Sequence, residues 1–313
     1  MRYVTISELR DIIRRNLWKI PHDIDLVVGV PRSGMLPASM IALYLNKRLT
    51  DLDSFLEGRV MSCGNTGWWH DDGKPFSKIL IVDDSIQFGR AIRDTKEKIN
   101  KLSVDYKYVY LTPIASIEGG KMVDLFFEII EGHRIFEWNL FHHPILQNSC
   151  MDIDGVLCKD PEEDDDGEIY RSFLQTAMPL YIPSRIVDTL ISCRLEKYRS
   201  FTQDWLAKNG IKYNNLIMLD MPDRTSRIKW GKYGEFKGLY YKNSSNILFV
   251  ESSCAQAEII ADVSQKPVIC VSSNMLILKK QKIQFKTRVK NKLMRISPNI
   301  GNTIVEFYRK IKL

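Results

Sequence analysis

Two pairs of acidic residues follow apolar runs of this chain, where carboxylates are well placed for chemistry. Asp83 and Asp84 end the run KILIVDD (78–84), after which small residues and Gly89 lead into a helical pattern. At the carboxyl end of a strand in a parallel sheet, such carboxylates can bind sugar hydroxyls. The free N–H groups of 85–91, at the start of a helix, can cradle a phosphate. The spacing therefore predicts a site for a phosphorylated sugar.

A second candidate anion loop, PRSGMLPA (31–38), follows the apolar run DLVVGV (25–30). Arg32 carries a fixed positive charge, and we expect Gly34 to permit an unusual backbone conformation before the next helix. The two loops are therefore expected to act on the same ligand.

Together, PRSG and IVDDSIQFGRA resemble the two motifs of the type I phosphoribosyltransferase family, over roughly residues 20–115. The resemblance implies that PRSG binds pyrophosphate, that the Asp pair contacts the ribose of phosphoribosyl pyrophosphate, and that Mg²⁺ bridges pyrophosphate and sugar. It also implies a mobile loop at 57–76, in which Trp68 and Trp69 either exclude water or simply pack. The implied substrate-binding residues are Arg32, Ser33, Gly34, Asp83, Asp84, Ser85, Gln87, Phe88, Gly89, Arg90 and Ala91.

Two residues depart from the family pattern. Phe88 replaces the usual Thr or Ser of the phosphate loop, so one hydroxyl is lost while the backbone donors remain. Gln87 stands where purine-type members carry an acidic base, which disfavours a 6-oxopurine acceptor.

The second acid pair lies in CMDIDGVLCKD (150–160), where Asp152 and Asp154 follow another apolar run and Gly155 allows a turn. A carboxylate that attacks phosphorus needs Mg²⁺ to neutralise the phosphate and a second acid to protonate the leaving oxygen. This spacing predicts an aspartate nucleophile.

The run resembles the first motif of the haloacid dehalogenase superfamily of phosphatases, and the resemblance extends over about 148–275. It implies that Ser192 binds the phosphoryl group, that Lys237 stabilises the aspartyl-phosphate, and that Asp152, Asp154 and Glu251 hold Mg²⁺. No second acid directly follows Glu251. Arg194 and Arg199 are expected to be solvated helix charges.

Short apolar, β-branched runs alternate with helical patterns in both halves, which indicates parallel sheets. The first series is 25–30, 78–84 and 106–115, and the second is 149–157, 186–193, 214–220, 246–252 and 267–272. We expect an α/β protein with two Rossmann-like parallel-sheet domains. These are a type I phosphoribosyltransferase fold at 1–145, and a haloacid dehalogenase-like fold with a minimal cap at 146–278. The acidic stretch 161–168 is expected to be a solvated loop.

The composition, 44% hydrophobic and 27% charged, is that of an ordinary globular protein. The six cysteines form no CxxC pair, so neither a zinc site nor a disulfide framework is expected. No run reaches the ~20 apolar residues of a membrane span, and the N-terminus lacks the apolar stretch of a signal peptide. We expect a cytoplasmic protein.

The net charge of +7 is concentrated in a basic tail. Residues 279–313 hold 11 Lys or Arg and one acid, which leaves −3 for residues 1–278. Phe285, Val289, Leu293 and Ile296 form one apolar helical stripe, which suits peripheral contact with the inner face of the cell membrane. Packing on the acidic body is the equal alternative, and nucleic-acid binding is disfavoured.

Phosphoribosyl transfer leaves a 5-phosphate that a fused phosphatase can remove, so the two steps together transfer ribofuranose. The chain resembles phosphoribosyltransferase–phosphatase systems of bacterial surface-polysaccharide synthesis, which implies a glycan or lipid-linked glycan acceptor. The alternatives are a nucleobase phosphoribosyltransferase fused to a nucleotidase, or a regulator that senses phosphoribosyl pyrophosphate. A homo-oligomer remains open.

Overall fold

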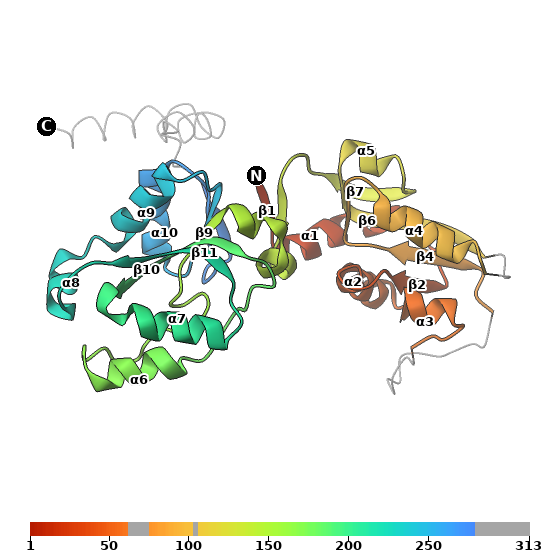
Figure 1. Ribbon diagram of the computed structural model, residues 1–313. Coiled ribbons are helices and arrows are strands. Elements are labelled where there is room, and N and C mark those ends of the chain that lie inside the picture. The colour runs from red at the N-terminus through yellow and green to blue at the C-terminus, as the bar shows by residue number, and fades with distance from the viewer. Residues whose placement is uncertain (62–74, 103–105, 279–313) are drawn as a thin grey trace, which may run out of the picture. The chain divides into compact units, whose positions relative to one another are not determined.

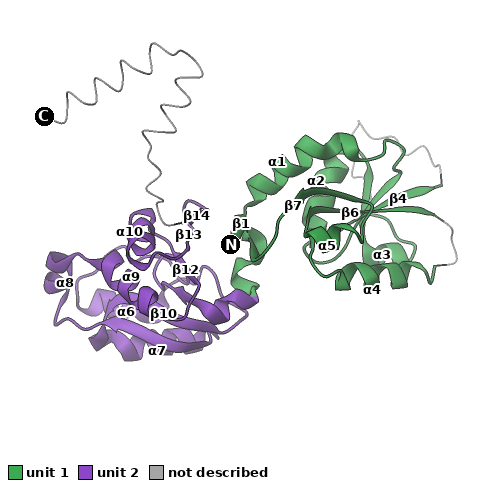
Figure 2. Cartoon of the chain, turned by 90° about the horizontal axis from the view of Figure 1, so that it is seen from above, with its two compact units in different colours: residues 1–143 green, residues 144–313 purple. Residues whose placement is uncertain are grey.

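The computed structural model describes residues 1–61, 75–102 and 106–278 and divides the chain into two compact units, Met1–His143 and Pro144–Leu313 (Figure 2). Most of the predicted mobile loop, with Trp68 and Trp69, and the whole basic tail lie outside the described residues. The predicted domain boundary at 145/146 falls within two residues of the division between the units.

The first unit is built on a parallel sheet of order β3-β2-β4-β6-β5, with β7 added beside β6 (Figure 1). A separate parallel pair joins β1 to β8. The strands are β1 (Arg2–Val4), β2 (Leu26–Gly29), β3 (Arg48–Asp51), β4 (Lys78–Val82), β5 (Ser85–Ile86), β6 (Lys107–Ala115), β7 (Leu125–Ile129) and β8 (Arg134–Phe136).

Helices cover both faces of this sheet, because alternate residues of its strands point to opposite sides. Val27, Leu80 and Leu111 pack on one core with α1 and α2, whereas Leu26 and Ile79 pack on the other with α3 and α4. The helices of this unit are α1 (Ile6–Asn16), α2 (Met35–Leu45), α3 (Leu52–Leu56), α4 (Arg90–Ile99) and α5 (Ile117–Gly120), with 3-10 turns at Leu17–Lys19 and Glu137–His142.

The second unit contains a six-stranded sheet of order β11-β10-β9-β12-β13-β14, in which only β14 is antiparallel. Its strands are β9 (Ser149–Met151), β10 (Val187–Leu195), β11 (Tyr213–Leu219), β12 (Leu248–Glu251), β13 (Val268–Cys270) and β14 (Met275–Ile277). The five predicted runs each supply one parallel strand, and the expectation of α/β units around parallel sheets is confirmed.

The helices of the second unit are α6 (Glu168–Thr176), α7 (Arg199–Lys208), α8 (Arg224–Trp230), α9 (Tyr233–Asn243) and α10 (Cys254–Ser264), with 3-10 turns at Pro144–Asn148 and Glu196–Tyr198. Between β9 and β10, the described chain forms only α6 and an extended segment that pairs with residues 157–159. No large cap is inserted at this point.

The acidic stretch at 161–168 is not simply the solvated loop that its composition suggests. Asp164 forms an ion pair with Arg227, and Asp166 binds Lys197 and the Tyr198 hydroxyl. These pairs fasten the stretch to other elements of the second unit.

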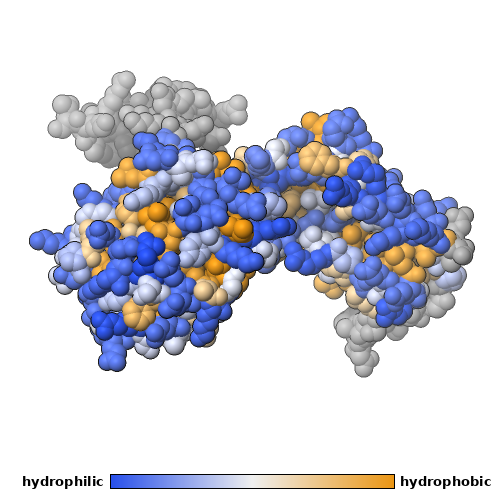
Figure 3. All heavy atoms as spheres, in the orientation of Figure 1, coloured by the Kyte–Doolittle hydropathy of each residue, from blue (hydrophilic) through white to orange (hydrophobic). Residues whose placement is uncertain are grey.

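On the face shown in Figure 3, much of the surface is hydrophilic, and apolar residues gather in patches on both units. Within the described ranges, no helix is both long enough and apolar enough to cross a bilayer.

Candidate functional site

Asp83 and Asp84 lie directly after β4, at the carboxyl end of a central strand of the first sheet. Asp84 is only 6% exposed, and its N–H donates to Asp83 Oδ1 at 2.8 Å. Burial, with Asp84 beside it, raises the pKa of Asp83 to about 7. Two carboxylates held this closely favour a ligand that brings hydroxyl donors or positive charge.

The loop 31–34 approaches the same strand end. A Cβ on Gly34 would lie 2.5 Å from Val30 O and 2.9 Å from Asp83 Cα, so only glycine fits between these backbones. Its φ of −63° is ordinary, so the expectation of an unusual backbone at Gly34 is wrong, and the lack of a side chain is what the site requires. Arg32 is exposed and Ser33 is half-buried in this loop, and the Pro31–Arg32 peptide bond is cis.

Residues 83 and 85–93 line a cavity of about 470 Å³, together with Thr112 of β6. Gly89, with a φ of 71°, stands immediately before α4, whose first residues Arg90 and Ala91 are exposed. The N–H groups at such a helix start attract anions. Ser85 is half-buried, Gln87 is exposed, and Phe88 is 78% exposed, so the substituted aromatic side chain does not fill the core.

Residues 134–139 contribute contacts to this site that the sequence analysis missed. Trp138 Nε1 donates to Asp84 Oδ2 at 2.9 Å, and the buried Arg134 donates to Ile86 O at 3.1 Å. Arg32 donates to Asn139 Oδ1 at 2.9 Å. The sequence gives no indication of these contacts, because residues 134–139 match no motif.

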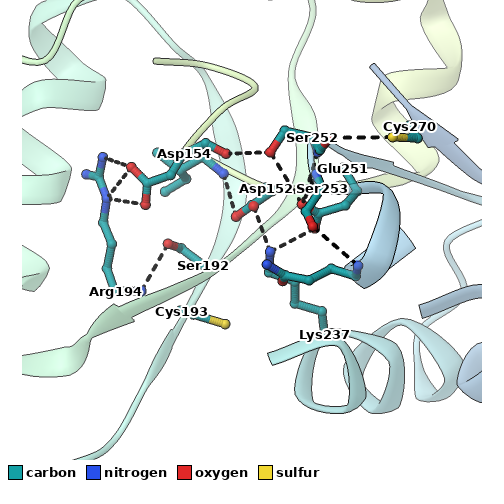
Figure 4. A network of polar contacts seen from close by, with 12 residues as sticks. Asp152, Asp154, Ser192, Cys193, Arg194, Lys237, Glu251, Ser252, Ser253 and Cys270 are labelled. Atoms are coloured by element: carbon teal, nitrogen blue, oxygen red, sulfur yellow. Dashed lines mark hydrogen bonds and ion pairs between the residues drawn. The ribbon is translucent and has the colours of Figure 1, made fainter. Parts of the chain in front are cut away.

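In the second unit, three segments distant in sequence bring Asp152, Lys237 and Glu251 together (Figure 4). Lys237 Nζ lies 2.6 Å from Asp152 Oδ2 and 2.7 Å from Glu251 Oε2. All three residues are at most 5% exposed. Burial alone would lower the pKa of Lys237, but the two carboxylates outweigh it and raise this pKa, so the ammonium stays protonated.

The other oxygens of these carboxylates accept backbone N–H groups. Ile153 N donates to Asp152 Oδ1 at 2.8 Å, and Ser252 N and Ser253 N both donate to Glu251 Oε1 at 3.0 Å. Burial raises the pKa of Asp152 well above its ordinary value despite Lys237.

Asp154 is bound by Arg194 of β10, whose Nη2 and Nε lie 2.7 and 3.1 Å from the two carboxylate oxygens. Arg194 is 1% exposed, so the expectation of a solvated helix charge is wrong for this residue. Burial would raise the pKa of Asp154, but the guanidinium outweighs it and lowers this pKa. Arg199, the other arginine of that expectation, starts α7 and pairs with Glu196.

Ser192 also lies on β10 and is fully buried. Its hydroxyl accepts the Arg194 N–H at 3.1 Å, and Ser252 Oγ donates to Asp154 O at 3.2 Å. These bonds connect all five residues predicted for this site into one local network (Figure 4).

The donors of this network fit Mg²⁺ in chemical type, since Asp152 and Glu251 offer hard carboxylate oxygens. Within residues 1–61, 75–102 and 106–278, however, no three His, Cys, Asp or Glu side chains are grouped so as to hold a metal. Of the three residues predicted to hold Mg²⁺, Asp152 and Glu251 remain the candidate side-chain ligands, whereas both carboxylate oxygens of Asp154 are bound by Arg194.

No protein-family model and no curated protein sequence matches this chain. A comparison of structures finds the purine phosphoribosyltransferase of Pyrococcus horikoshii, at 19% identity and a TM-score of 0.33 over 44% of this chain and 93% of that one. The xanthine-guanine-hypoxanthine phosphoribosyltransferase of Helicobacter pylori is also found, at 13% identity and a TM-score of 0.34 over 44% of this chain and 92% of that one. The orotate phosphoribosyltransferase of Aeropyrum pernix matches at 21% identity and a TM-score of 0.28, over 38% of this chain and 66% of that one. At these values, an activity has to be argued from the site residues.

Proposed function

We propose that the chain is a bifunctional enzyme that transfers a 5-phosphoribosyl group from phosphoribosyl pyrophosphate to an acceptor and then removes the 5-phosphate. The observation that carries the proposal is that each unit has its own pair of acids at the carboxyl ends of parallel strands, with Asp83 half-buried and Asp84, Asp152 and Glu251 buried. Asp83 and Asp84 adjoin a helix start, whereas Asp152 and Glu251 share a buried lysine.

In the first step, the carboxylates of Asp83 and Asp84 hold the ribose hydroxyls, while the N–H groups at the start of α4 hold the 5-phosphate. Positive charge develops on the ribose as the bond from C1 to pyrophosphate breaks, and the two carboxylates stabilise it. The acceptor hydroxyl oxygen then bonds to C1, and its proton passes to solvent water. Arg32 is placed to bind the departing pyrophosphate.

In the second step, ionised Asp152 attacks the phosphorus of the 5-phosphate and forms an aspartyl-phosphate, while the bond from phosphorus to the ribose oxygen breaks and that oxygen takes a proton from solvent water. Lys237 stabilises the charge on the phosphoryl oxygens. Asp154, kept ionised by Arg194, then accepts a proton from the water that hydrolyses the aspartyl-phosphate. Mg²⁺ held by Asp152 and Glu251 would neutralise phosphate charge.

The proposed acceptor is a glycan or lipid-linked glycan, and this assignment rests on the sequence resemblance alone. Contact of the basic tail with the membrane would bring the enzyme to such an acceptor. The tail proposal is tested by vesicle sedimentation: protein that ends at Leu278 should bind anionic vesicles less than the full chain at low salt. Equal binding would refute it.

The two activities should be separable by mutation. Asp83→Asn with Asp84→Asn should abolish pyrophosphate release from phosphoribosyl pyrophosphate in the presence of acceptor, yet leave phosphate release from ribose 5-phosphate unchanged. Asp152→Asn should abolish phosphate release from ribose 5-phosphate and leave pyrophosphate release unchanged. If the double Asn variant still consumes phosphoribosyl pyrophosphate at the normal rate, the first site is misassigned.

A further inference from the structure

Two cysteines lie beside the candidate phosphatase site without taking part in it. Cys270 ends β13, and Cys254 is the first residue of α10, directly after the Ser252–Ser253 turn that binds Glu251. Figure 4 shows Cys270 next to Ser252, whose carbonyl oxygen lies 3.4 Å from Cys270 Sγ. The thiols and the turn are therefore in direct contact.

The two sulfur atoms are 3.1 Å apart. Ser272 Oγ bridges them, at 3.4 Å from Cys254 Sγ and 3.3 Å from Cys270 Sγ, and also donates to Ser252 O at 2.6 Å. A disulfide has a sulfur separation of about 2.05 Å, so joining the pair requires a movement of about 1 Å. Side-chain rotation at the exposed Cys254 can supply much of it.

The pKa of Cys254 is shifted in the opposite direction to the pKa values of Cys150 and Cys193. Hydrogen bonds from Ser272, Ser273 and Cys270 lower its pKa to about 7, so a large fraction is thiolate at neutral pH. Burial instead raises the pKa of Cys150 to about 11 and of Cys193 to about 12. An exposed thiolate next to a second thiol is the arrangement of a redox-sensitive pair.

We propose that Cys254 and Cys270 form a redox-active dithiol that hydrogen peroxide converts to a disulfide. The Cys254 thiolate attacks one peroxide oxygen, the O–O bond breaks, and hydroxide leaves to give a sulfenic acid. Cys270 then attacks the Cys254 sulfur, the S–S bond forms, and the oxygen leaves as water. Two thiols lose two electrons, and one peroxide becomes two waters.

The disulfide also affects the neighbouring site. The bond would pull the start of α10 toward β13 and shift the Ser252–Ser253 turn, whose two N–H groups hold Glu251 Oε1. Displacing groups that orient a metal ligand commonly costs about tenfold or more in activity. This consequence rests on the proposed phosphatase function, whereas the disulfide itself does not.

The test uses the full chain, reduced, freed of reductant and treated with equimolar hydrogen peroxide at neutral pH. Mass spectrometry after alkylation and digestion should find a peptide pair joined through Cys254 and Cys270, and dithiothreitol should remove it. Phosphate release from ribose 5-phosphate should fall about tenfold on oxidation and recover on reduction. The exposed-site variant Cys254→Ser should give no cross-link and should keep its activity in peroxide.

The outcomes distinguish the claims. Oxidation of Cys254 to sulfinic acid without a link to Cys270, or a link to another cysteine, overturns the dithiol proposal. A Cys254–Cys270 link that leaves the phosphatase rate unchanged refutes the coupling to Glu251. If the link forms but the reduced protein has no phosphatase activity, the proposed function fails and the dithiol stands.

Discussion

Asp83 and Asp84 are adjacent in sequence, but their side chains have different partners. Asp84 accepts the Trp138 indole N–H, whereas the partner of Asp83 Oδ1 is the N–H of its neighbour. Motif spacing predicts the pair and its place after a strand. It does not predict Trp138 or Arg134, because only folding brings 134–139 to the end of β4.

The raised pKa of Asp83 predicts a pH dependence of stability. The pKa of Asp83 is about 7 in the folded state and 3.8 in the unfolded chain, so between these pH values the folded state binds more protons than the unfolded state. Stability from this group is therefore lost as pH rises from about 4 to 7. Asp83→Asn should be more stable than wild type by about 1–2 kcal/mol at pH 8, with a smaller advantage at pH 5. Urea unfolding that gives the same difference at both pH values would contradict this.

Trp138 is expected to position Asp84 for the ribose. The ring centroids of Trp138 and Phe136 are 4.9 Å apart, and Trp138→Phe keeps an aromatic ring in this stack but removes the N–H donor. We expect KM for phosphoribosyl pyrophosphate to rise about tenfold, in line with the loss of about 1.4 kcal/mol of hydrogen bonding. Steady-state kinetics would check this, with phosphate release from ribose 5-phosphate as the control that must not change. An unchanged KM would exclude this role.

The ion pair of Arg194 and Asp154 should show strong coupling in a double-mutant cycle. Arg194→Met leaves the half-buried Asp154 carboxylate without its partner and should lower the free energy of unfolding by about 3 kcal/mol. Adding Asp154→Asn removes the stranded charge and should restore part of that loss. Equilibrium unfolding in urea measures each corner of the cycle, and additive effects would show that the pair is not coupled.

At the scale of elements, most of the apolar strands were predicted, but the apolar β7 (Leu125–Ile129) and several short strands were not. β3, with the sequence RLTD, has no apolar run, and β1 and β8 pair only with each other across 130 residues of chain. The run 149–157 supplies β9, which ends at Met151, and the following residues turn toward the site, as the placement of Asp152 and Asp154 after a strand predicts. Their apolar side chains are buried by the turn instead.

The contact between loop 31–34 and β4 predicts that Gly34→Ala damages the first unit. The added Cβ would lie 2.5 Å from Val30 O and 2.8 Å from Val82 O, and neither backbone can move freely. We expect the melting temperature to fall, with a cost of about 1–3 kcal/mol, and pyrophosphate release to be lost. Ser33→Ala, in the same loop, is the matched control and should change stability little. Equal melting temperatures for Gly34→Ala and wild type would contradict the close approach.

At the scale of the whole molecule, two strand series predicted two sheets, and the chain forms them in two compact units. The network around Asp152 illustrates how much of a site the sequence motifs can predict. Asp152, Lys237 and Glu251 were predicted to act together, and both carboxylates lie within 2.7 Å of the Lys237 ammonium. The pairing of Arg194 with Asp154, in contrast, gave no signal in the sequence. A buried arginine is recognised only when its strand is placed in the sheet.

The central claim, that one chain adds phosphoribose and then removes its phosphate, is tested most directly with phosphoribosyl pyrophosphate radiolabelled in the 5-phosphate. Wild type and Asp152→Asn are each incubated with this donor and a glycan-containing membrane fraction. Wild type should release the label as inorganic phosphate, whereas Asp152→Asn should leave it attached to the acceptor, because an amide cannot form an aspartyl-phosphate. The same distribution of label with both proteins would contradict the account.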